Sequence, residues 1–208
     1  MLQLKEIYYQ PATAEKLILS NITFQSRNKQ PIIISGPSGS GKTSLIEIIS
    51  GLTAPNKGSV FWKNQLVKEQ KRRSISGVVF QFPERHFIGL TISHELKLGH
   101  RRISGEMQAD VLNKVGLGNI SLKELPERLS GGQQRRLAIA VQLIRGPKIL
   151  LLDEPTAGLD WSVRDEILHL IKRLSKEQLI IIVTHEPDLF SNWQVCNYQL
   201  LNGALNNV

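Results

Sequence analysis

One eight-residue segment, GPSGSGKT at positions 36–43, constrains the fold of this chain more than any other. It follows three consecutive isoleucines at positions 32–34, and an unbroken β-branched run is typical of a strand buried on both faces. It precedes residues 45–49, whose leucine and isoleucines recur at helical spacing, and Gly51 then supplies a helix stop. A strand, a glycine-rich turn and a helix in this order are typical of an α/β unit.

The same segment matches the pattern G-x-x-x-x-G-K-[ST], whose glycines let successive backbone N–H groups face a chain of phosphates. The N-terminus of the following helix adds a partial positive charge. We therefore expect Lys42 to reach the β- and γ-phosphates of ATP and the Thr43 hydroxyl to bind Mg²⁺. The residues expected to contact the nucleotide here are Gly36, Pro37, Ser38, Gly39, Ser40, Gly41, Lys42, Thr43 and Ser44.

Two acidic residues follow three leucines at positions 150–152. A carboxylate at the C-terminal end of a parallel strand points into the crevice where open α/β sheets bind ligands. Asp153 is therefore predicted to hold the Mg²⁺ that Thr43 also contacts. Glu154 is the candidate for the base that orients and deprotonates an attacking water. Taken alone, these acids could equally begin a turn before Pro155, but the phosphate loop favours the functional interpretation.

Further aliphatic runs predict a central sheet. Residues 78–80, 149–152 and 179–183 are short runs of the doubly buried type, and residues 162–175 carry apolar side chains at helical spacing. Because a strand, a helix and a strand in this order imply parallel pairing, we expect an α/β fold of the P-loop NTPase type with a mainly parallel central sheet.

The outer parts of the chain are predicted to differ from this sheet. Residues 2–9 and 22–24 alternate apolar and polar side chains, which predicts an N-terminal antiparallel β subdomain. Residues 84–146 have no strand-like run but do have helical patterning, which predicts a helical subdomain. The Asn-Gly pair at 202–203 is typical of a type I′ hairpin. With no internal repeat or linker, we expect one domain over residues 1–208.

Composition excludes several classes of protein. At 208 residues and 41% hydrophobic, the chain can bury a sizeable core, which excludes collagen-like and disordered classes. The longest aliphatic run, residues 179–183, is far shorter than the roughly 20 apolar residues of a membrane-spanning helix. The single cysteine, Cys196, has no internal disulfide partner, which fits a reducing compartment.

The net charge of +8, from 26 Lys and Arg against 18 Asp and Glu, suits nucleic acid, an anionic membrane surface or a phosphorylated ligand. It does not discriminate among the three. The basic residues form only short clusters, such as Arg135 with Arg136, and we expect most of them to be solvated.

A second motif, LSGGQ at residues 129–133, opens a predicted helix and resembles the signature motif of the ABC ATPases. Ser130 suits a helix N-cap, and Gly131 and Gly132 leave bare N–H groups at a positive helix end, next to Gln133. Alone, a cap with two glycines is a common structural stop. Beside a phosphate loop, these four residues are expected to form a second anion site.

The resemblance to the ABC ATPases covers nearly the whole chain and implies roles for further residues. In that family a glutamine after a strand senses Mg²⁺ and the attacking water, and Gln81 holds this position. The D-loop of the family is similar to residues 157–160, which implies that Asp160 lies at the nucleotide. The family's switch histidine, which contacts the γ-phosphate, corresponds to His185, the one histidine of five that ends a strand-like run.

The resemblance further implies a mechanism and partners. ATP with Mg²⁺ would lie between two ATPase subunits, either two copies of this chain or this chain and a paralogue. Each subunit would offer its phosphate loop to one nucleotide and its Ser130 helix end to the other. ATP would close the pair and hydrolysis would open it, and this movement would drive an integral membrane transporter subunit. No direct nucleic-acid binding is expected.

Within the family, residues 81–87 and 135–140 and Trp161 look most like the energy-coupling-factor ATPases and their cyanobacterial and chloroplast relatives. Those ATPases serve importers of small solutes, vitamins or transition-metal ions. The resemblance therefore implies a peripheral subunit on the cytoplasmic face of a membrane. Phe82 and Phe87 would line the groove that receives a coupling helix of the membrane subunit, or else belong to the core of the helical subdomain.

Two features depart from the family pattern. Pro11 falls where an aromatic residue usually stacks on adenine, although Tyr8 and Tyr9 lie nearby. The chain ends 23 residues after His185, so we expect no C-terminal regulatory domain.

The alternative function is a soluble ABC ATPase that acts on ribosomes or DNA, which the charge of +8 suits. Such relatives typically carry two ATPase domains in one chain or long coiled-coil arms, and this sequence shows neither. A kinase of the phosphate-loop type would leave the motif at 129–133 unexplained.

Overall fold

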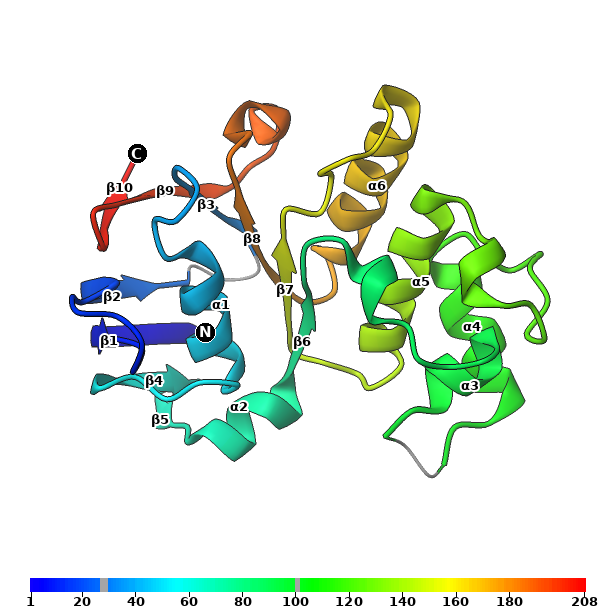
Figure 1. Cartoon of the computed structure of the whole chain (residues 1–208), viewed down its shortest axis with the longest axis horizontal. Coiled ribbons are helices and arrows are strands. Elements are labelled where there is room, and N and C mark those ends of the chain that lie inside the picture. Colours follow the sequence, from blue (N-terminus) through cyan, green and yellow to red (C-terminus); the bar gives the residue numbers. More distant parts are fainter. Residues whose placement is uncertain (27–29, 100–101) are drawn as a thin grey trace.

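The computed structural model describes residues 1–26, 30–99 and 102–208. Two β-sheets form its framework, and helices pack between and beside them (Figure 1). The larger sheet has the order β10-β9-β3-β8-β7-β6. Its strands are β3 (Ile32–Ser35), β6 (Ser76–Val79), β7 (Ile149–Asp153), β8 (Leu179–Thr184), β9 (Cys196–Leu201) and β10 (Ala204–Asn207). Neighbours from β9 to β6 run parallel and β10 pairs antiparallel with β9, which confirms the predicted sheet.

The central strands are buried on both faces. Every residue of β7 and β8 is buried. Because successive side chains of a strand point to opposite faces, Leu150 and Leu152 join one apolar cluster while Ile149 and Leu151 join the other. The unbroken aliphatic runs of the sequence are therefore two interleaved sets of core residues.

The smaller sheet is antiparallel and has the order β2-β1-β4-β5. Its strands are β1 (Leu2–Tyr9), β2 (Leu19–Gln25), β4 (Lys57–Trp62) and β5 (Gln65–Leu66). The first two confirm the predicted N-terminal antiparallel sheet. The sequence did not predict β4 and β5, because exposed residues such as Lys57 and Gln65 leave no clear apolar alternation there.

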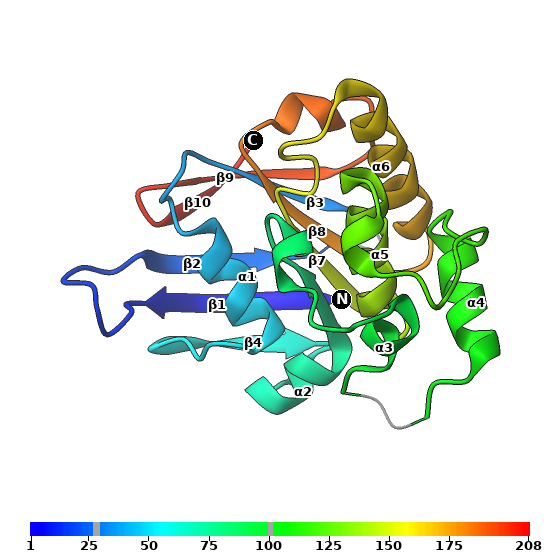
Figure 2. The same cartoon turned by 45° about the vertical axis from the view of Figure 1, so that its right-hand side comes forward.

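Helix α1 (Lys42–Ser50) lies between the two sheets (Figure 2). Its buried Leu45 and Ile48 belong to the apolar cluster that β1, β3 and β8 share. The helix ends at Gly51, which adopts the left-handed conformation with φ of 82°. The predicted helix stop is thus confirmed, and α1 fixes the phosphate-loop segment against the core.

Helices cover the other face of the central sheet (Figure 1). They are η1 (Pro83–His86), α3 (Ile92–Lys97), α4 (Gly105–Lys114), η2 (Pro126–Arg128), α5 (Gly131–Leu143) and α6 (Trp161–Leu174). The smaller ones pack around α5, as expected for a helical subdomain. In the described ranges, none of the helices is long and apolar enough to cross a membrane.

Helix α2 (Glu69–Ile75) was not predicted, because its sequence is mostly charged. It docks through two buried residues, Arg72 and Ile75. The Arg72 guanidinium donates to the Val67 carbonyl at 3.2 Å and pairs with Glu69 at 3.1 Å. Two buried side chains, one of them charged, are too few to give a recognisable helical pattern of apolar residues in the sequence.

The last two strands form the predicted hairpin. Asn202 and Gly203 have φ of 50° and 76°, the two positive values of a type I′ turn. A Cβ on Gly203 would lie 2.7 Å from the carbonyl oxygen of Ile18, so the turn packs directly beside the start of β2. The short helix η3 (Pro187–Phe190) connects β8 to this hairpin.

Shortening Leu151 to Ala should lower the free energy of unfolding by about 2–5 kcal/mol, because a fully buried leucine leaves a cavity in the central sheet. The matched control is Leu66→Ala, whose side chain is 60% exposed on β5, with an expected change within about 0.5 kcal/mol. Urea unfolding followed by circular dichroism measures both. Equal losses in the two variants would contradict the described core.

Candidate functional site

The segment 36–43 forms the turn between β3 and α1, as predicted. Gly41 is the N-cap of α1 and has a left-handed φ of 98°. A Cβ on Gly41 would lie 2.8 Å from a side-chain carbon of Ile18, so only glycine fits this close approach. No side chain caps α1. The N–H groups at its positive end therefore keep their capacity for an anion.

Lys42 is buried at the mouth of this loop. Its ammonium donates to the carbonyl oxygens of Gly36 at 2.8 Å and Pro37 at 2.9 Å. Among the described residues it forms no ion pair, and the nearby Ser40 hydroxyl is buried without a hydrogen-bond partner. An uncompensated cation and an unused hydroxyl in one turn fit a phosphate group.

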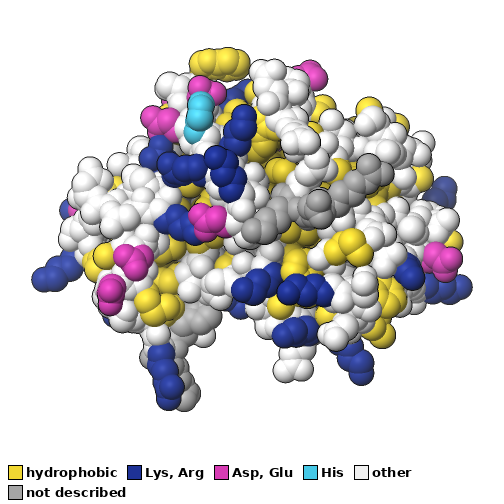
Figure 3. All heavy atoms as spheres, turned by 180° about the vertical axis from the view of Figure 1, so that it is seen from behind, with side chains coloured by type: hydrophobic (Ala, Val, Ile, Leu, Met, Phe, Trp, Pro, Cys, Tyr) yellow, Lys and Arg dark blue, Asp and Glu magenta, His cyan; other side chains and the backbone are white. Residues whose placement is uncertain are grey.

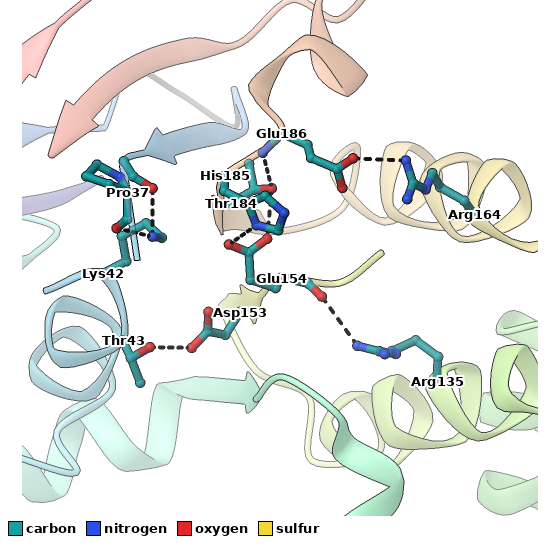
Figure 4. A network of polar contacts seen from close by, with 11 residues as sticks. Pro37, Lys42, Thr43, Arg135, Asp153, Glu154, Arg164, Thr184, His185 and Glu186 are labelled. Carbon is teal, nitrogen blue, oxygen red and sulfur yellow. Dashed lines mark hydrogen bonds and ion pairs between the residues drawn. The ribbon is translucent and has the colours of Figure 1, made fainter. Parts of the chain in front are cut away.

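Thr43 and Asp153 meet across two elements. The Thr43 hydroxyl, at the start of α1, donates to Oδ2 of Asp153, at the end of β7, at 2.7 Å (Figure 4). Burial raises the pKa of the Asp153 carboxyl above its ordinary value, against the hydrogen bond from Thr43; Glu154 raises it further and Lys42 lowers it. The ligand-free protein therefore supplies this carboxylate with less positive charge than its burial requires.

A divalent cation would supply that charge. In the described parts of the chain, no three His, Cys, Asp or Glu side chains converge to hold a metal ion by themselves. One carboxylate beside one hydroxyl nevertheless fits Mg²⁺, which binds through one or two carboxylates and takes the rest of its ligands from phosphates and water.

Glu154 follows β7 in a left-handed conformation, with φ of 47°, which is uncommon for a residue other than glycine. Its carboxylate accepts a hydrogen bond from the Thr184 hydroxyl at 3.0 Å, and its other oxygen lies 2.8 Å from Nδ1 of His185 (Figure 4). Glu154 is 6% exposed, whereas His185 faces solvent. A carboxylate held on both sides in this way can accept a proton from a water molecule.

These groups line one cleft of about 560 Å³. Its lining residues are Ile18, Ser38, Gly39, Gly41, Lys42, Thr43, Ser44, Gln81, Asp153, Glu154 and His185. Six of the nine predicted phosphate-loop residues thus line one cleft with the predicted acidic, glutamine and histidine residues. Pro37 and Ser40 line an adjoining cavity instead, and Gly36 lines neither. Sequence reasoning missed Ile18, for which the sequence offers no signal.

A second cavity of about 580 Å³ adjoins this cleft and shares Ile18, Ser38 and Gly39 with it. It is also lined by residues 14–17 and by the hairpin turn 202–203. None of its described lining residues is aromatic, and Tyr8, Tyr9 and Pro11 are not among them.

Ser130, the residue of the second motif that caps α5, lies outside this cleft. Its hydroxyl accepts from the Gln133 N–H at 3.4 Å and the Gln133 side chain accepts from the Ser130 N–H at 2.9 Å, which confirms the N-cap. Gly131 is exposed, but a Cβ on Gly132 would lie 2.3 Å from Val163 of α6, so Gly132 also serves packing. Gly131, Gly132, Gln133 and Asp160 were also predicted to contact a nucleotide, and they too lie outside the lining of this cleft.

The sequence profile of the family described as ABC transporter matches residues 19–157. The chain belongs to the ABC transporter family. It is 36% identical, over 201 residues, to the chloroplastic ABC transporter I family member 11 of Arabidopsis thaliana, covering 89% of this chain and 72% of that one. It is 39% identical, over 196 residues, to the energy-coupling factor transporter ATP-binding protein EcfA2 of Clostridium acetobutylicum, covering 86% and 68%. These relatives confirm the resemblance drawn from the motifs.

Solved structures of ABC proteins share the fold. The cbiO1 protein of Clostridium perfringens, described as part of the ABC transporter complex cbiONQ, has a TM-score of 0.87 at 28% identity, over 99% of this chain and 86% of that one. The ATP-binding cassette MJ0796, a dimer bound to ADP and Pi after hydrolysis, has a TM-score of 0.84 at 29% identity, over 100% and 98%. This ABC chain is therefore an ATPase of the transporter class.

Replacing Asp153 by Asn should stabilise the ligand-free protein, because Asn keeps an acceptor for Thr43 without a buried charge. Since the folded-state pKa of Asp153 is raised, the folded parent binds more protons than the unfolded chain at pH values between the unfolded-state and folded-state pKa. The stability of the parent therefore falls as the pH rises from the unfolded-state pKa through the folded-state pKa. The melting-temperature gap between variant and parent should therefore widen from about pH 4 to about pH 7, reaching about 2–4 °C.

Differential scanning calorimetry in EDTA measures this gap. Asp110→Asn, on the exposed face of α4, is the matched control and should show no widening. A gap that is independent of pH, or a destabilised Asp153→Asn variant, would contradict the assignment of an uncompensated buried carboxylate.

Proposed function

We propose that this ABC ATPase is the nucleotide-binding subunit of a small-solute importer, binding ATP with Mg²⁺ in the cleft of about 560 Å³. One observation carries the proposal: a phosphate loop, a hydroxyl–carboxylate pair and a carboxylate–imidazole pair converge in that cleft. Each of the three has one part of phosphoryl transfer to perform.

The phosphate loop would hold the nucleotide. Lys42, whose ammonium is shared by two loop carbonyls, would exchange them for the β- and γ-phosphates. Thr43 and Asp153 would hold Mg²⁺, with Gln81 on the same cleft as a further oxygen ligand. When bound, Mg²⁺ neutralises charge on the phosphate oxygens.

Glu154 would act as the base. The proton of the attacking water passes to its carboxylate as the water oxygen bonds to phosphorus, and ADP leaves with the electrons of the broken P–O bond. Thr184 and His185 fix the direction of the carboxylate, so its orientation does not depend on the substrate. His185, exposed at the cleft, would contact the γ-phosphate.

The cavity of about 580 Å³ would receive the nucleoside. Leu17 and Ile18 line it and none of its described lining residues is aromatic, so we infer that aliphatic side chains cover the base in this chain. The hairpin turn 202–203 also lines this cavity.

A second ATPase subunit would complete the site. The Ser130 end of α5 is exposed, capped and separate from the cleft of its own chain. An anion-binding helix end that does not reach the local nucleotide is available to the nucleotide of a neighbour. The dimeric state of the similar MJ0796 structure supports this arrangement, with a second copy or a paralogue as partner.

An integral membrane subunit would dock at a groove of about 390 Å³ beside Gln81. Phe87 lines this groove, which supports it as an anchor. Phe82 does not; it lies under Arg85, 3.3 Å from where a Cβ of Gly158 would be. The names of the energy-coupling-factor transporter and cbiONQ transporter relatives support a transporter subunit. We further propose an importer of vitamins or transition-metal ions, with this chain peripheral on the cytoplasmic face, as the resemblance of residues 81–87 and 135–140 implies.

Glu154→Gln should lower ATP turnover by about 10²- to 10⁴-fold while the dissociation constant for ATP stays within about twofold, because the amide keeps the shape but accepts no proton. Steady-state phosphate release and equilibrium dialysis measure the two quantities. Glu124→Gln, at a surface ion pair with Arg128, is the matched control and should turn over like the parent. Parent-level turnover in Glu154→Gln would reject the assigned base.

A further inference from the structure

Arg135 is an unusual cation in this chain. Most of the Lys and Arg side chains on the face in Figure 3 stand at the surface. Arg135, in the second turn of α5, is only 2% exposed. Among the described residues it forms no ion pair, and its Nε has no hydrogen-bond partner. Burial lowers the pKa of its guanidinium, and Glu84 only partly offsets this.

Stability does not account for such a residue. A buried charge without a paired carboxylate opposes folding, and an apolar side chain of similar volume is usually neutral or favourable in its place. The functional question is therefore what the guanidinium holds.

It holds the turn that carries Glu154. One Nη atom of Arg135 donates to the carbonyl of Glu154 at 3.4 Å (Figure 4). The other donates to the carbonyl of Ala157 at 3.0 Å. The fork thus spans the turn from its first residue to its last, beside the Ala157 N–H bond to the Glu154 carbonyl at 3.1 Å. Glu154 has the strained φ of 47°, so its conformation needs such external support.

The other end of this link is the Ser130 cap of α5. Arg135 lies about one helical turn after that cap, and Gly132 between them packs on Val163 of α6 without room for a Cβ. The helix end and the turn at Glu154 are thus connected by one short, rigid segment and one side chain.

We infer that Arg135 is a positioning residue: from the backbone side it fixes the place of the Glu154 carboxylate, and it ties that place to the Ser130 end of α5. The inference rests on the proposed function, in which Glu154 is the base. A nucleotide bound at the Ser130 end of one chain would therefore influence the position of Glu154 in that same chain. This Glu154 acts on the second nucleotide of the dimer, which is bound by its own phosphate loop.

The test compares Arg135→Met, which removes the donors and fills the volume, with the parent. Turnover should fall by about 10- to 100-fold, since small misplacement of a reacting group has effects of this size. The dissociation constant for ATP should stay within about twofold, and circular dichroism should show a folded protein, because Met fills most of the volume of the removed side chain. The matched control is Arg173→Met, an exposed arginine on α6 that donates to the Lys114 carbonyl at 3.1 Å; it should turn over like the parent.

Two further readouts separate positioning from a general structural role. In Arg135→Ala, millimolar methylguanidinium should restore part of the lost turnover, because it can occupy the vacated space and donate to both carbonyls. In a Glu154→Gln background, Arg135→Met should lower the residual turnover by less than about twofold, because the group it positions is already inactive.

Parent-level turnover in folded Arg135→Met, or a full additional loss in the Glu154→Gln background, would overturn the inference while leaving Glu154 as the base. Parent-level turnover in Glu154→Gln alone would instead overturn the proposed function and this inference with it. Should Arg135→Met not fold, Arg135→Lys is measured in its place. Lysine reaches one carbonyl at a time, so a loss of about threefold or more is expected and parent-level turnover again overturns the inference.

Discussion

The two acids that end β7 point in different directions, and the site depends on this divergence. The Asp153 carboxylate meets Thr43 on α1. Glu154 turns into the left-handed conformation, so its carboxylate meets Thr184 and His185 at the end of β8 instead. Adjacent carboxylates repel each other, and separate partners keep both in one cleft. In the proposed function this separation lets one acid serve the metal and the other serve the water.

The site is assembled from groups that are unfavourable in the ligand-free chain. Asp153 is a buried carboxylate with a raised pKa, Lys42 is a buried ammonium that forms no ion pair with the described residues, and Glu154 has a strained backbone conformation. The fully buried strands β7 and β8 supply the apolar packing that offsets these terms. Such a concentration of unfavourable groups is expected at a functional site and is rare elsewhere in a fold. Arg135, which is buried and does not line the cleft, belongs to the same set.

Sequence reasoning succeeded where local pattern and tertiary environment agree. The loop at 36–43 was recognised because glycine, lysine and threonine at fixed spacing after a buried strand have few other uses. It failed for charged residues outside the phosphate-loop and acidic motifs: α2 was missed, and Arg135 was not distinguished from the basic residues, most of which were expected to be solvated. A charge carries no local signal of burial, since its partners, here the carbonyls of Glu154 and Ala157, are distant in sequence. The position of the hairpin turn 202–203, in the lining of a cavity beside the phosphate loop, also carries no local signal. It results from the pairing of β9 with β3, which are distant in sequence.

In the proposed function, one chain holds only part of what its nucleotide contacts, because the Ser130 end of α5 lies outside the cleft of the same chain. The most direct measurement is the mass in solution of the Glu154→Gln variant with saturating ATP and Mg²⁺, by sedimentation equilibrium. The account predicts an ATP-dependent pair with twice the chain mass of 23.4 kDa. A particle that stays at 23.4 kDa while it is folded and loaded with ATP would contradict it.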